Sequence, residues 1–274
     1  MICAAFLFAI LPSACIGEEQ DSRIAAQPLI TTAAADETTA ARTATTRAAE
    51  ASASAASPKK QAPSRTQPAT GATAAGKSNA ATRFTINEFM VLNQLPELPT
   101  GCEVTSLTMV LNHLGYSCTK LELADNYLAK GVLGQTDPRK AFIGDPASET
   151  DSRGCYAPVV ADTANKYLTA QGAARRAADI SGNELETLFR YIQKGTPVIV
   201  WGTMDCAPVQ PTDVWEIDGQ TIQWLRPEHC MVLVGYDDTQ IFEADPYYAT
   251  VKPYDIETFR TAYNGLHRQA VVIE

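Results

Sequence analysis

The sequence has little that could cross a membrane or hold a structural metal ion. Only Met1 to Cys15 form a long apolar run, and this run is too short to span a bilayer. No later segment is apolar enough to do so, which excludes a protein of several membrane spans. The seven cysteines include no C-x-x-C pair, which argues against a structural zinc site. We therefore expect no metal and no cofactor.

Aromatic residues are missing from residues 16–83, which consist largely of Ala, Thr and Ser. Such a segment cannot bury enough apolar surface to offset the entropy lost on ordering. We predict a disordered Ala/Thr/Ser-rich tether over residues 16–83. A single folded domain should then occupy residues 84–274, which contain all three Trp, all ten Tyr and all three His.

Basic residues are scarce in the predicted domain. The chain has a net charge of −9, but residues 84–274 hold 14 Lys and Arg against 25 Asp and Glu, a net charge of −11. An acidic domain repels phosphate backbones and anionic membrane surfaces, so nucleic acid is not expected as a partner. A peptide or protein substrate, cationic or neutral, fits this charge better.

The N-terminal run has no Lys or Arg, yet its length suits the core of a signal peptide. Its end, Leu11 to Cys15, is similar to a bacterial lipobox, in which Cys15 is lipidated and becomes the new N-terminus. The alternative is ordinary cleavage after Ala14. We therefore expect an exported protein at the cell surface, lipid-anchored or otherwise secreted, with membrane contact only through that anchor.

One cysteine lies where a helix is predicted to begin. Thr100 and Glu103 have the spacing of a capping box, and Gly115 suits a left-handed residue after the helix end. Cys102 would then lie in the first helical turn, where the positive end of the helix dipole favours a thiolate. The alternative is a small buried cysteine at a helix start. The apolar stripe that predicts this helix comprises Val104, Leu107, Leu111 and Leu114.

Predicted helices precede predicted strands along the domain. Apolar periodicity indicates helices near residues 121–128, 157–168 and 185–192, the last with a capping-box spacing from Ser181 to Glu184. Residues 131–154 form a long loop, either a cleft wall or surface decoration. Strand patterns follow, including a hairpin around Asp218-Gly219. This order predicts an α+β fold with a helical N-terminal lobe, an antiparallel sheet lobe and a cleft between them.

Few histidines are available as a base for a cysteine nucleophile. His113 lies on the same predicted helix, about 16 Å from Cys102 at roughly 1.5 Å per residue. His267 has no carboxylate in a position that suggests a catalytic pair, so it is expected to be a surface histidine. His229 stands at the start of an apolar strand, and the following strand ends at Asp245. If the two strands form a hairpin, His229 and Asp245 become neighbours.

Three segments of the sequence resemble the C-39-like cysteine peptidases, a papain-fold family. They are Gln94 to Leu107, Glu228 to Asp238, and Asp245-Pro246. The resemblance extends over residues 85–274. It implies Cys102 as the nucleophile, His229 as the general base and Asp245 as the residue that orients it. It also implies Gln94 as the side-chain donor of an oxyanion hole, with the backbone N–H of Cys102 as the second donor.

Three functions are consistent with these patterns. The first is an exported peptidase or amidase that cleaves a peptide bond through a Cys-His-Asp triad. The second is a cell-wall hydrolase that cuts peptidoglycan stem peptides, and the third is a surface binding module that has lost turnover. The sequence leaves open whether the remaining domain cysteines form disulfides; these are Cys118, Cys155, Cys206 and Cys230.

Overall fold

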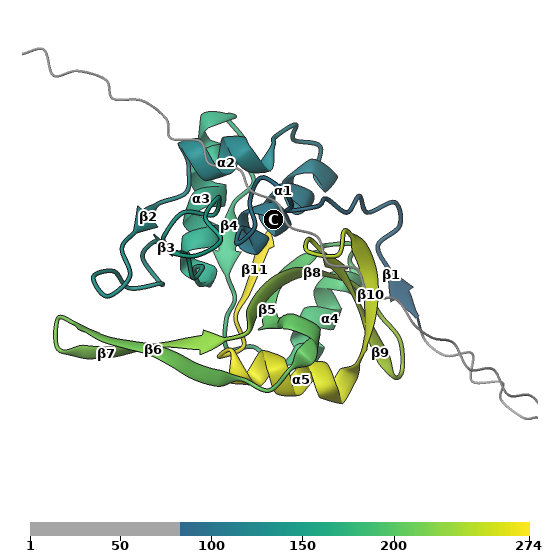
Figure 1. The fold of residues 1–274 in the computed structure, drawn as a ribbon. Helices are drawn as coiled ribbons and strands as arrows, with labels where there is room; N and C mark the ends of the chain where they lie inside the picture. Colours follow the sequence, from purple (N-terminus) through teal and green to yellow (C-terminus); the bar gives the residue numbers. More distant parts are fainter. Residues whose placement is uncertain (1–82) are drawn as a thin grey trace, which may run out of the picture. The chain divides into compact units, whose positions relative to one another are not determined.

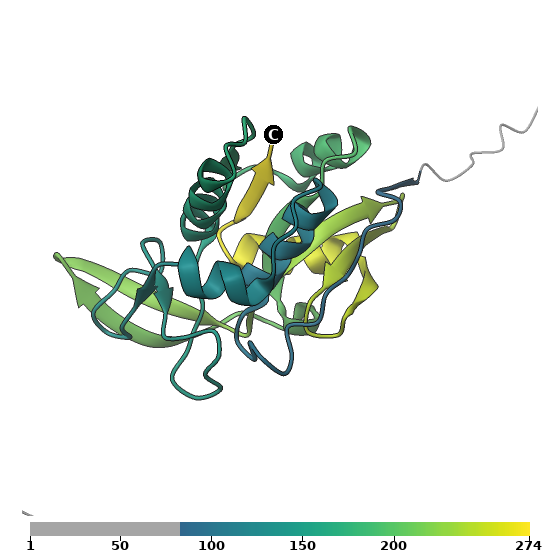
Figure 2. The same cartoon turned by 90° about the horizontal axis from the view of Figure 1, so that it is seen from above.

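The computed structural model describes residues 83–274, and these form an α+β fold built on one twisted antiparallel sheet (Figures 1 and 2). The predicted signal segment 1–15, Cys15 and the tether up to residue 82 lie outside the described residues. Within the described part, no helix combines the length and the apolar character that crossing a bilayer requires.

The main sheet has the strand order β10-β9-β8-β5-β11-β4, and β1 pairs with the end of β8. The central strand β8 is buried along almost its whole length, because β5 and β9 pair on its two sides and helices cover both of its faces. The strands are β1 (Phe84–Thr85), β4 (Ala177–Asp179), β5 (Val198–Thr203), β8 (Glu228–Tyr236), β9 (Gln240–Asp245), β10 (Thr250–Asp255) and β11 (Ala270–Ile273).

Helices cover both faces of this sheet. On one face α1 (Cys102–His113) and α3 (Ala157–Ala170) pack on the side chains of Trp201, Val232 and Val271. On the other face α4 (Leu185–Gln193) and α5 (Ile256–Gly265) pack on Val200, Leu233 and Val272. Because side chains alternate along a strand, neighbouring residues of each strand pack into opposite cores. The short helix α2 (Lys120–Asn126) packs beside α1.

A second, two-stranded sheet projects from the main body. Strands β6 (Gln210–Ile217) and β7 (Gln220–Arg226) form the predicted hairpin around Asp218-Gly219, and both turn residues have positive φ (50° and 75°). Figure 1 shows this ribbon reaching away from the main sheet. Its base is fastened by an ion pair of 2.7 Å between Arg153 Nε and Asp213 Oδ2.

The segment between α2 and α3 is the predicted long loop, interrupted by a short parallel pair, β2 (Lys130–Gly131) and β3 (Phe142–Ile143). Its side chains Glu149, Thr150, Ser152 and Arg153 line a pocket together with Cys102 and His229. The interpretation as a cleft wall is therefore confirmed.

Both predicted capping boxes are wrong. Helix α1 has Gly101 as its N-cap, and the Thr100 hydroxyl donates instead to the backbone carbonyls of Pro146 and Ser148. Helix α4 begins only after Glu184, with no side-chain cap. The helix ends match better, because Gly115 and Gly195 adopt φ of 90° and 79° just beyond α1 and α4.

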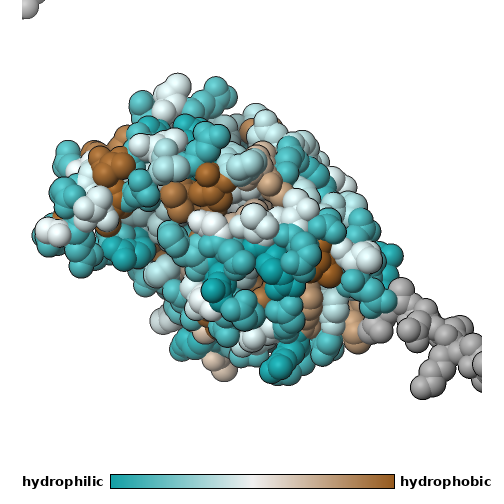
Figure 3. Space-filling view, turned by 90° about the horizontal axis from the view of Figure 1, so that it is seen from below, coloured by the Kyte–Doolittle hydropathy of each residue, from teal (hydrophilic) through white to brown (hydrophobic). Residues whose placement is uncertain are grey.

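The surface is mixed rather than uniformly polar. On the face in Figure 3, apolar side chains gather in separate patches within a largely hydrophilic surface. The large apolar residues most exposed in the described part of the chain are Met90, Val132 and Val214, at 63%, 57% and 57%. Scattered apolar exposure of this kind is usual for soluble domains.

Candidate active site

Cys102 lies in the first turn of α1, as the sequence predicted, and is the first residue of the helix; it is 6% exposed. Its Sγ accepts a hydrogen bond from the backbone N–H of Cys230 at 3.4 Å, which ties the helix to β8. The Ser106 hydroxyl, one turn later, donates to the Cys230 carbonyl at 3.1 Å. These two contacts fix the first turns of α1 against the central strand.

His229 and Asp245 are neighbours, which confirms the prediction from the hairpin. His229 Nε2 lies 2.9 Å from Asp245 Oδ1, and the two residues are 1% and 0% exposed. Strands β8 and β9 pair in antiparallel register, so the start of β8 lies beside the end of β9. Because Nε2 faces the carboxylate, Nδ1 remains as the ring nitrogen that can exchange a proton in the pocket.

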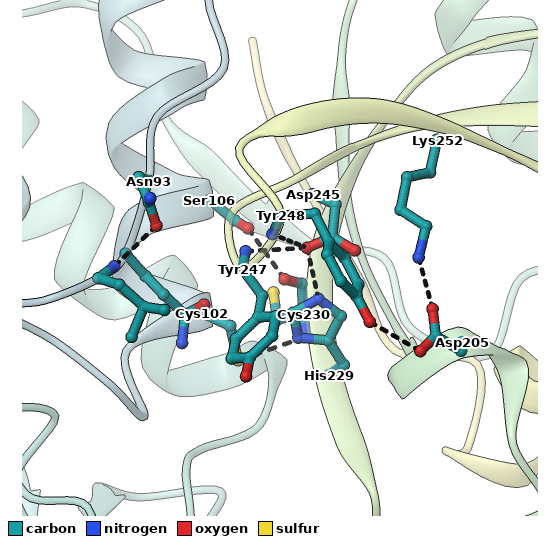
Figure 4. Close-up of polar contacts among 12 residues, drawn as sticks. Asn93, Cys102, Ser106, Asp205, His229, Cys230, Asp245, Tyr247, Tyr248 and Lys252 are labelled. Carbon is teal, nitrogen blue, oxygen red and sulfur yellow. Dashed lines mark hydrogen bonds and ion pairs between the residues drawn. The ribbon is translucent and has the colours of Figure 1, made fainter. Parts of the chain in front are cut away.

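The carboxylate of Asp245 is held by more than the histidine. Its Oδ1 also accepts from the backbone N–H groups of Tyr247 at 2.9 Å and Tyr248 at 3.3 Å, as Figure 4 shows. Burial by itself would raise the pKa of Asp245, but the contact with His229 and these two N–H bonds outweigh burial and lower it. Asp245 is therefore an anion that can hold an imidazolium in place.

Gln94 lies at the same pocket and is 3% exposed. Its Nε2 donates to the Pro99 carbonyl at 2.8 Å, which orients the amide and leaves one N–H of the group for another acceptor. Its backbone N–H donates to Pro246 O at 2.8 Å, and Lys120 Nζ binds its carbonyl at 2.8 Å. The segment before α1 is thus attached both to α2 and to the end of β9.

The pocket has a volume of about 350 Å³ and brings residues from distant parts of the chain together. Gln94 and Cys102 come from the helical side, while Glu228 and His229 come from the start of β8. Figure 4 shows Cys102, His229 and Cys230 in the same region of the fold. The structure therefore brings the four residues predicted for catalysis to one place, with Asp245 behind His229.

Two carboxyls next to the thiol were not predicted, the buried Glu103 and the half-buried Glu228. Glu103 is 0% exposed, its Oε1 accepts from Cys155 N at 2.6 Å, and its Oε2 lies 3.4 Å from Cys102 Sγ. Ligand atoms of Cys102, Glu103 and Glu228 lie within 4.8 Å of one another. Both oxygens of Glu103 and the Cys102 sulfur have hydrogen-bond partners in the protein, whereas Glu228 Oε1 is buried with no partner among the described residues.

The cluster changes the electrostatics of the thiol. Burial, followed by the charges of Glu103 and Glu228, raises the pKa of Cys102 well above its ordinary value. This is the opposite of the direction predicted from the helix dipole. The dipole is equivalent to only about half a unit charge, and two carboxyls and the loss of water outweigh it here.

None of the cysteines in residues 83–274 forms a disulfide. All five are free, and Cys155 and Cys230 are 0% exposed. The backbone N–H of Cys155 donates to the Glu103 carboxyl. Among the five described cysteines, Cys206 is the one that is half-buried.

The comparison with family models identifies the fold. The model of the Peptidase_C39 like family matches residues 86–271. The chain belongs to this family. The C39-like chain is 33% identical over 195 residues to the uncharacterized protein YvpB of Bacillus subtilis strain 168, covering 68% of this chain and 75% of YvpB.

A solved structure supports the same assignment. The crystal structure of a proposed C39-like peptidase from Bacillus anthracis is 28% identical, with a TM-score of 0.64 over 70% of this chain and 98% of that one. The expected family and the papain-like α+β fold class are therefore confirmed. Membership in a family of cysteine peptidases follows from the same two matches.

Sequence reasoning missed the acidic pair although a signal existed. Glu103 precedes Leu107 and Leu111 by one and two helical repeats of four residues, so it belongs to the buried stripe of α1. Glu228 directly precedes His229 and lines the pocket. A carboxyl on a buried helical stripe needs a partner, and in the structure this partner is the Cys155 N–H.

Proposed function

We propose that residues 84–274 form a cysteine peptidase that hydrolyses a peptide or amide bond through Cys102, His229 and Asp245. What supports this most directly is the contact of 2.9 Å between His229 Nε2 and Asp245 Oδ1, buried beside a pocket that also contains the Cys102 thiol. A histidine whose tautomer is fixed by a carboxylate, next to a cysteine in a cleft, is the arrangement that activates a thiol.

The proposed reaction proceeds through a thioester. His229 Nδ1 accepts the Cys102 proton as the sulfur attacks the substrate carbonyl carbon, and Asp245 stabilises the imidazolium. The oxyanion is held by the Cys102 backbone N–H, which lies at a helix start where such groups lack intrahelical acceptors, and by Gln94 Nε2. The imidazolium then protonates the leaving amine. Water, deprotonated by His229, attacks the thioester and releases the acid and the free thiol.

The substrate is proposed to be a peptide segment that is neutral or cationic. The acidic side chain of Glu149 lines the catalytic pocket, and of the two arginines there, Arg153 and Arg226, Arg153 is already paired with Asp213. The net charge of −11 over residues 84–274 acts in the same direction.

Peptidase activity can be tested by incubating the full chain separately with denatured casein and with purified wall sacculi. Released amines are then measured, and Cys102→Ala is compared with Cys206→Ala, which removes a half-buried free thiol that is not among the pocket residues. We expect Cys102→Ala to abolish release and Cys206→Ala to retain it. Release from sacculi alone would favour the wall hydrolase. No release from either substrate by the unaltered chain would favour the binding module.

Export and anchoring remain proposals based on residues 1–15 and the tether, outside the described residues. Labelled palmitate should be incorporated into the protein and lost in Cys15→Ala. A chain that begins at Arg83, whose guanidinium lies 4.4 Å from the centre of the Phe242 ring, should keep the melting temperature of the full chain. A large loss of melting temperature would contradict the proposed boundary.

A further inference from the structure

The position of Glu103 beside the nucleophile is not explained by the proposed triad. Glu103 follows Cys102 in the first turn of α1, is fully buried, and places Oε2 3.4 Å from the sulfur. Neither Glu103 nor Glu228 forms an ion pair with a Lys or Arg of residues 83–274. A buried carboxylate without a cation is costly, so this carboxyl needs a reason to be there.

The carboxyl of Glu103 cannot swing away from the thiol. The Cys155 N–H holds Oε1 at 2.6 Å, which leaves Oε2 as the oxygen that faces Sγ. Gly154 packs closely against both carboxyls, since a Cβ added there would lie 2.5 Å from Glu103 Oε1 and 3.1 Å from Glu228 Oε2. The relative positions of the carboxyl and the sulfur are therefore fixed by packing.

The surroundings of this carboxyl favour its neutral form. Two carboxyls this close in a buried site do not both ionise readily, because like charges repel strongly where water is excluded. Burial raises the pKa of Glu103 to about 7, and burial together with Glu103 raises that of Glu228 well above its ordinary value. The titratable groups facing the pair are the thiols Cys102, Cys155 and Cys230 and the phenol of Tyr156.

The same geometry gives opposite effects in the two protonation states. An ionised Glu103 can only accept a hydrogen bond, so it holds Cys102 as a thiol and repels a thiolate. A protonated Glu103 has an O–H on Oε2 that can point at the sulfur, and charge-assisted hydrogen bonds of this type are strong. The charge on Glu103 therefore decides whether the transfer of the thiol proton to His229 is favourable.

We propose that Glu103 acts as a neutral carboxylic acid that donates a hydrogen bond to the Cys102 thiolate, and that its burial away from any cation of residues 83–274 keeps it protonated. In the step that forms the ion pair, the S–H bond breaks, its proton passes to His229 Nδ1, and the electron pair stays on sulfur. Glu103 keeps its own proton throughout. This proposal rests on the proposed function, since it deepens the activation of the same nucleophile.

The distinguishing consequence is the pH dependence of the thiol. A free cysteine reacts faster with alkylating reagents as pH rises, because its thiolate fraction grows. Here the reactive state needs two protons, one on Glu103 and one on His229. As pH rises above about 7, Glu103 ionises and the thiol form of Cys102 becomes favoured over the thiolate. The alkylation rate of Cys102 should therefore fall.

The test uses iodoacetamide on the full chain from about pH 5 to about pH 9, with the Cys102 peptide followed by mass spectrometry. We expect the unaltered rate to fall above about pH 7. In Glu103→Gln, the amide N–H can donate to the sulfur at every pH, so the fall in rate should vanish. At about pH 8 the alkylation rate of Cys102 in this variant should be about tenfold or more above that of the unaltered protein. A Cys102 rate that rises steadily with pH in both proteins would overturn the proposal.

Two further variants keep the test decisive if Glu103→Gln folds poorly. Glu228→Gln replaces the neighbouring carboxyl with a neutral amide of similar size, so burial still holds the Glu103 proton and the fall in rate should stay near about pH 7. Glu122→Gln removes a first-turn carboxyl of α2 that acts on Cys118, and it should leave the Cys102 profile unchanged. Loss of the fall in Glu228→Gln would assign the titration to Glu228 and contradict the role of Glu103. Because alkylation needs no turnover, absence of hydrolysis would refute the proposed function without affecting this result.

Discussion

Replacing Asp245 with Asn separates the charge of the carboxylate from its hydrogen bonds. Three donors converge on Oδ1, from His229 Nε2, Tyr247 N and Tyr248 N, while Oδ2 has no partner among the described residues. An asparagine with its carbonyl oxygen in the Oδ1 position keeps all three bonds and the same tautomer of His229. Only the negative charge facing the imidazolium is lost.

The magnitude follows from that charge. Two unit charges about 4 Å apart at an effective dielectric constant of about 20 interact by about 4 kcal/mol, equivalent to roughly a thousandfold in rate. Because the hydrogen bonds remain, Asp245→Asn should lose little stability. Asp245→Ala leaves three buried donors without an acceptor and should cost about 3–5 kcal/mol, a decrease in melting temperature of about 10 °C for a domain of this size.

The assay compares both variants by thermal unfolding and by single-turnover hydrolysis of casein or sacculi. The alkylation rate of Cys102 at about pH 6 serves as a measure of the ion pair that does not depend on substrate. We expect Asp245→Asn to fold like the unaltered protein and react roughly 10²–10³ times more slowly. If Asp245→Asn turned over at the unaltered rate, the assignment of Asp245 as the group that stabilises the imidazolium would be wrong.

Three other outcomes are expected. Gln94→Ala should reduce kcat by about 10²–10³ with little change in KM, because it removes one oxyanion donor, and an unchanged kcat would exclude that role. Gly154→Ala should destabilise the fold by about 1–3 kcal/mol in denaturant titrations, since its φ is 136° and the added Cβ would lie 2.5 Å from Glu103 Oε1. The contribution of Glu103 to stability should be fully present below about pH 4.5 and lost as pH rises through about 7, because the folded protein binds more protons than the unfolded chain between these values. Its size is about 3 kcal/mol, and melting curves of Glu103→Gln at several pH values should lack this slope.

Local sequence determined the pairing of His229 with Asp245. The two residues lie on consecutive strands joined by a short connection, so the hairpin alone brings the start of β8 beside the end of β9. The alternating pattern around Asp218-Gly219 and the cap of α5, where the Asp255 side chain accepts from Thr258 N, were predictable for the same reason. In each case a few neighbouring residues suffice to decide the geometry.

Tertiary packing decided the environment of the nucleophile. The spacing of Thr100 and Glu103 favours a capping box, but such a cap contributes only about 1 kcal/mol, and tertiary contacts replace it. The Thr100 hydroxyl donates to the carbonyls of Pro146 and Ser148, and the Cys155 N–H donates to the Glu103 carboxyl. These partners lie more than 40 residues away in the sequence, so helical spacing could not reveal them.

The sequence by itself therefore determined which residues carry the proposed chemistry, since their types and the order of elements place Cys102, His229 and Gln94 at one pocket. It could not determine the protonation state of Cys102. That state depends on the loss of water and on the two carboxyls of Glu103 and Glu228, which approach the sulfur only when α1, the segment after β3 and the start of β8 pack together. Charge interactions in a buried site depend on distance and solvent exposure, and only the folded chain fixes both.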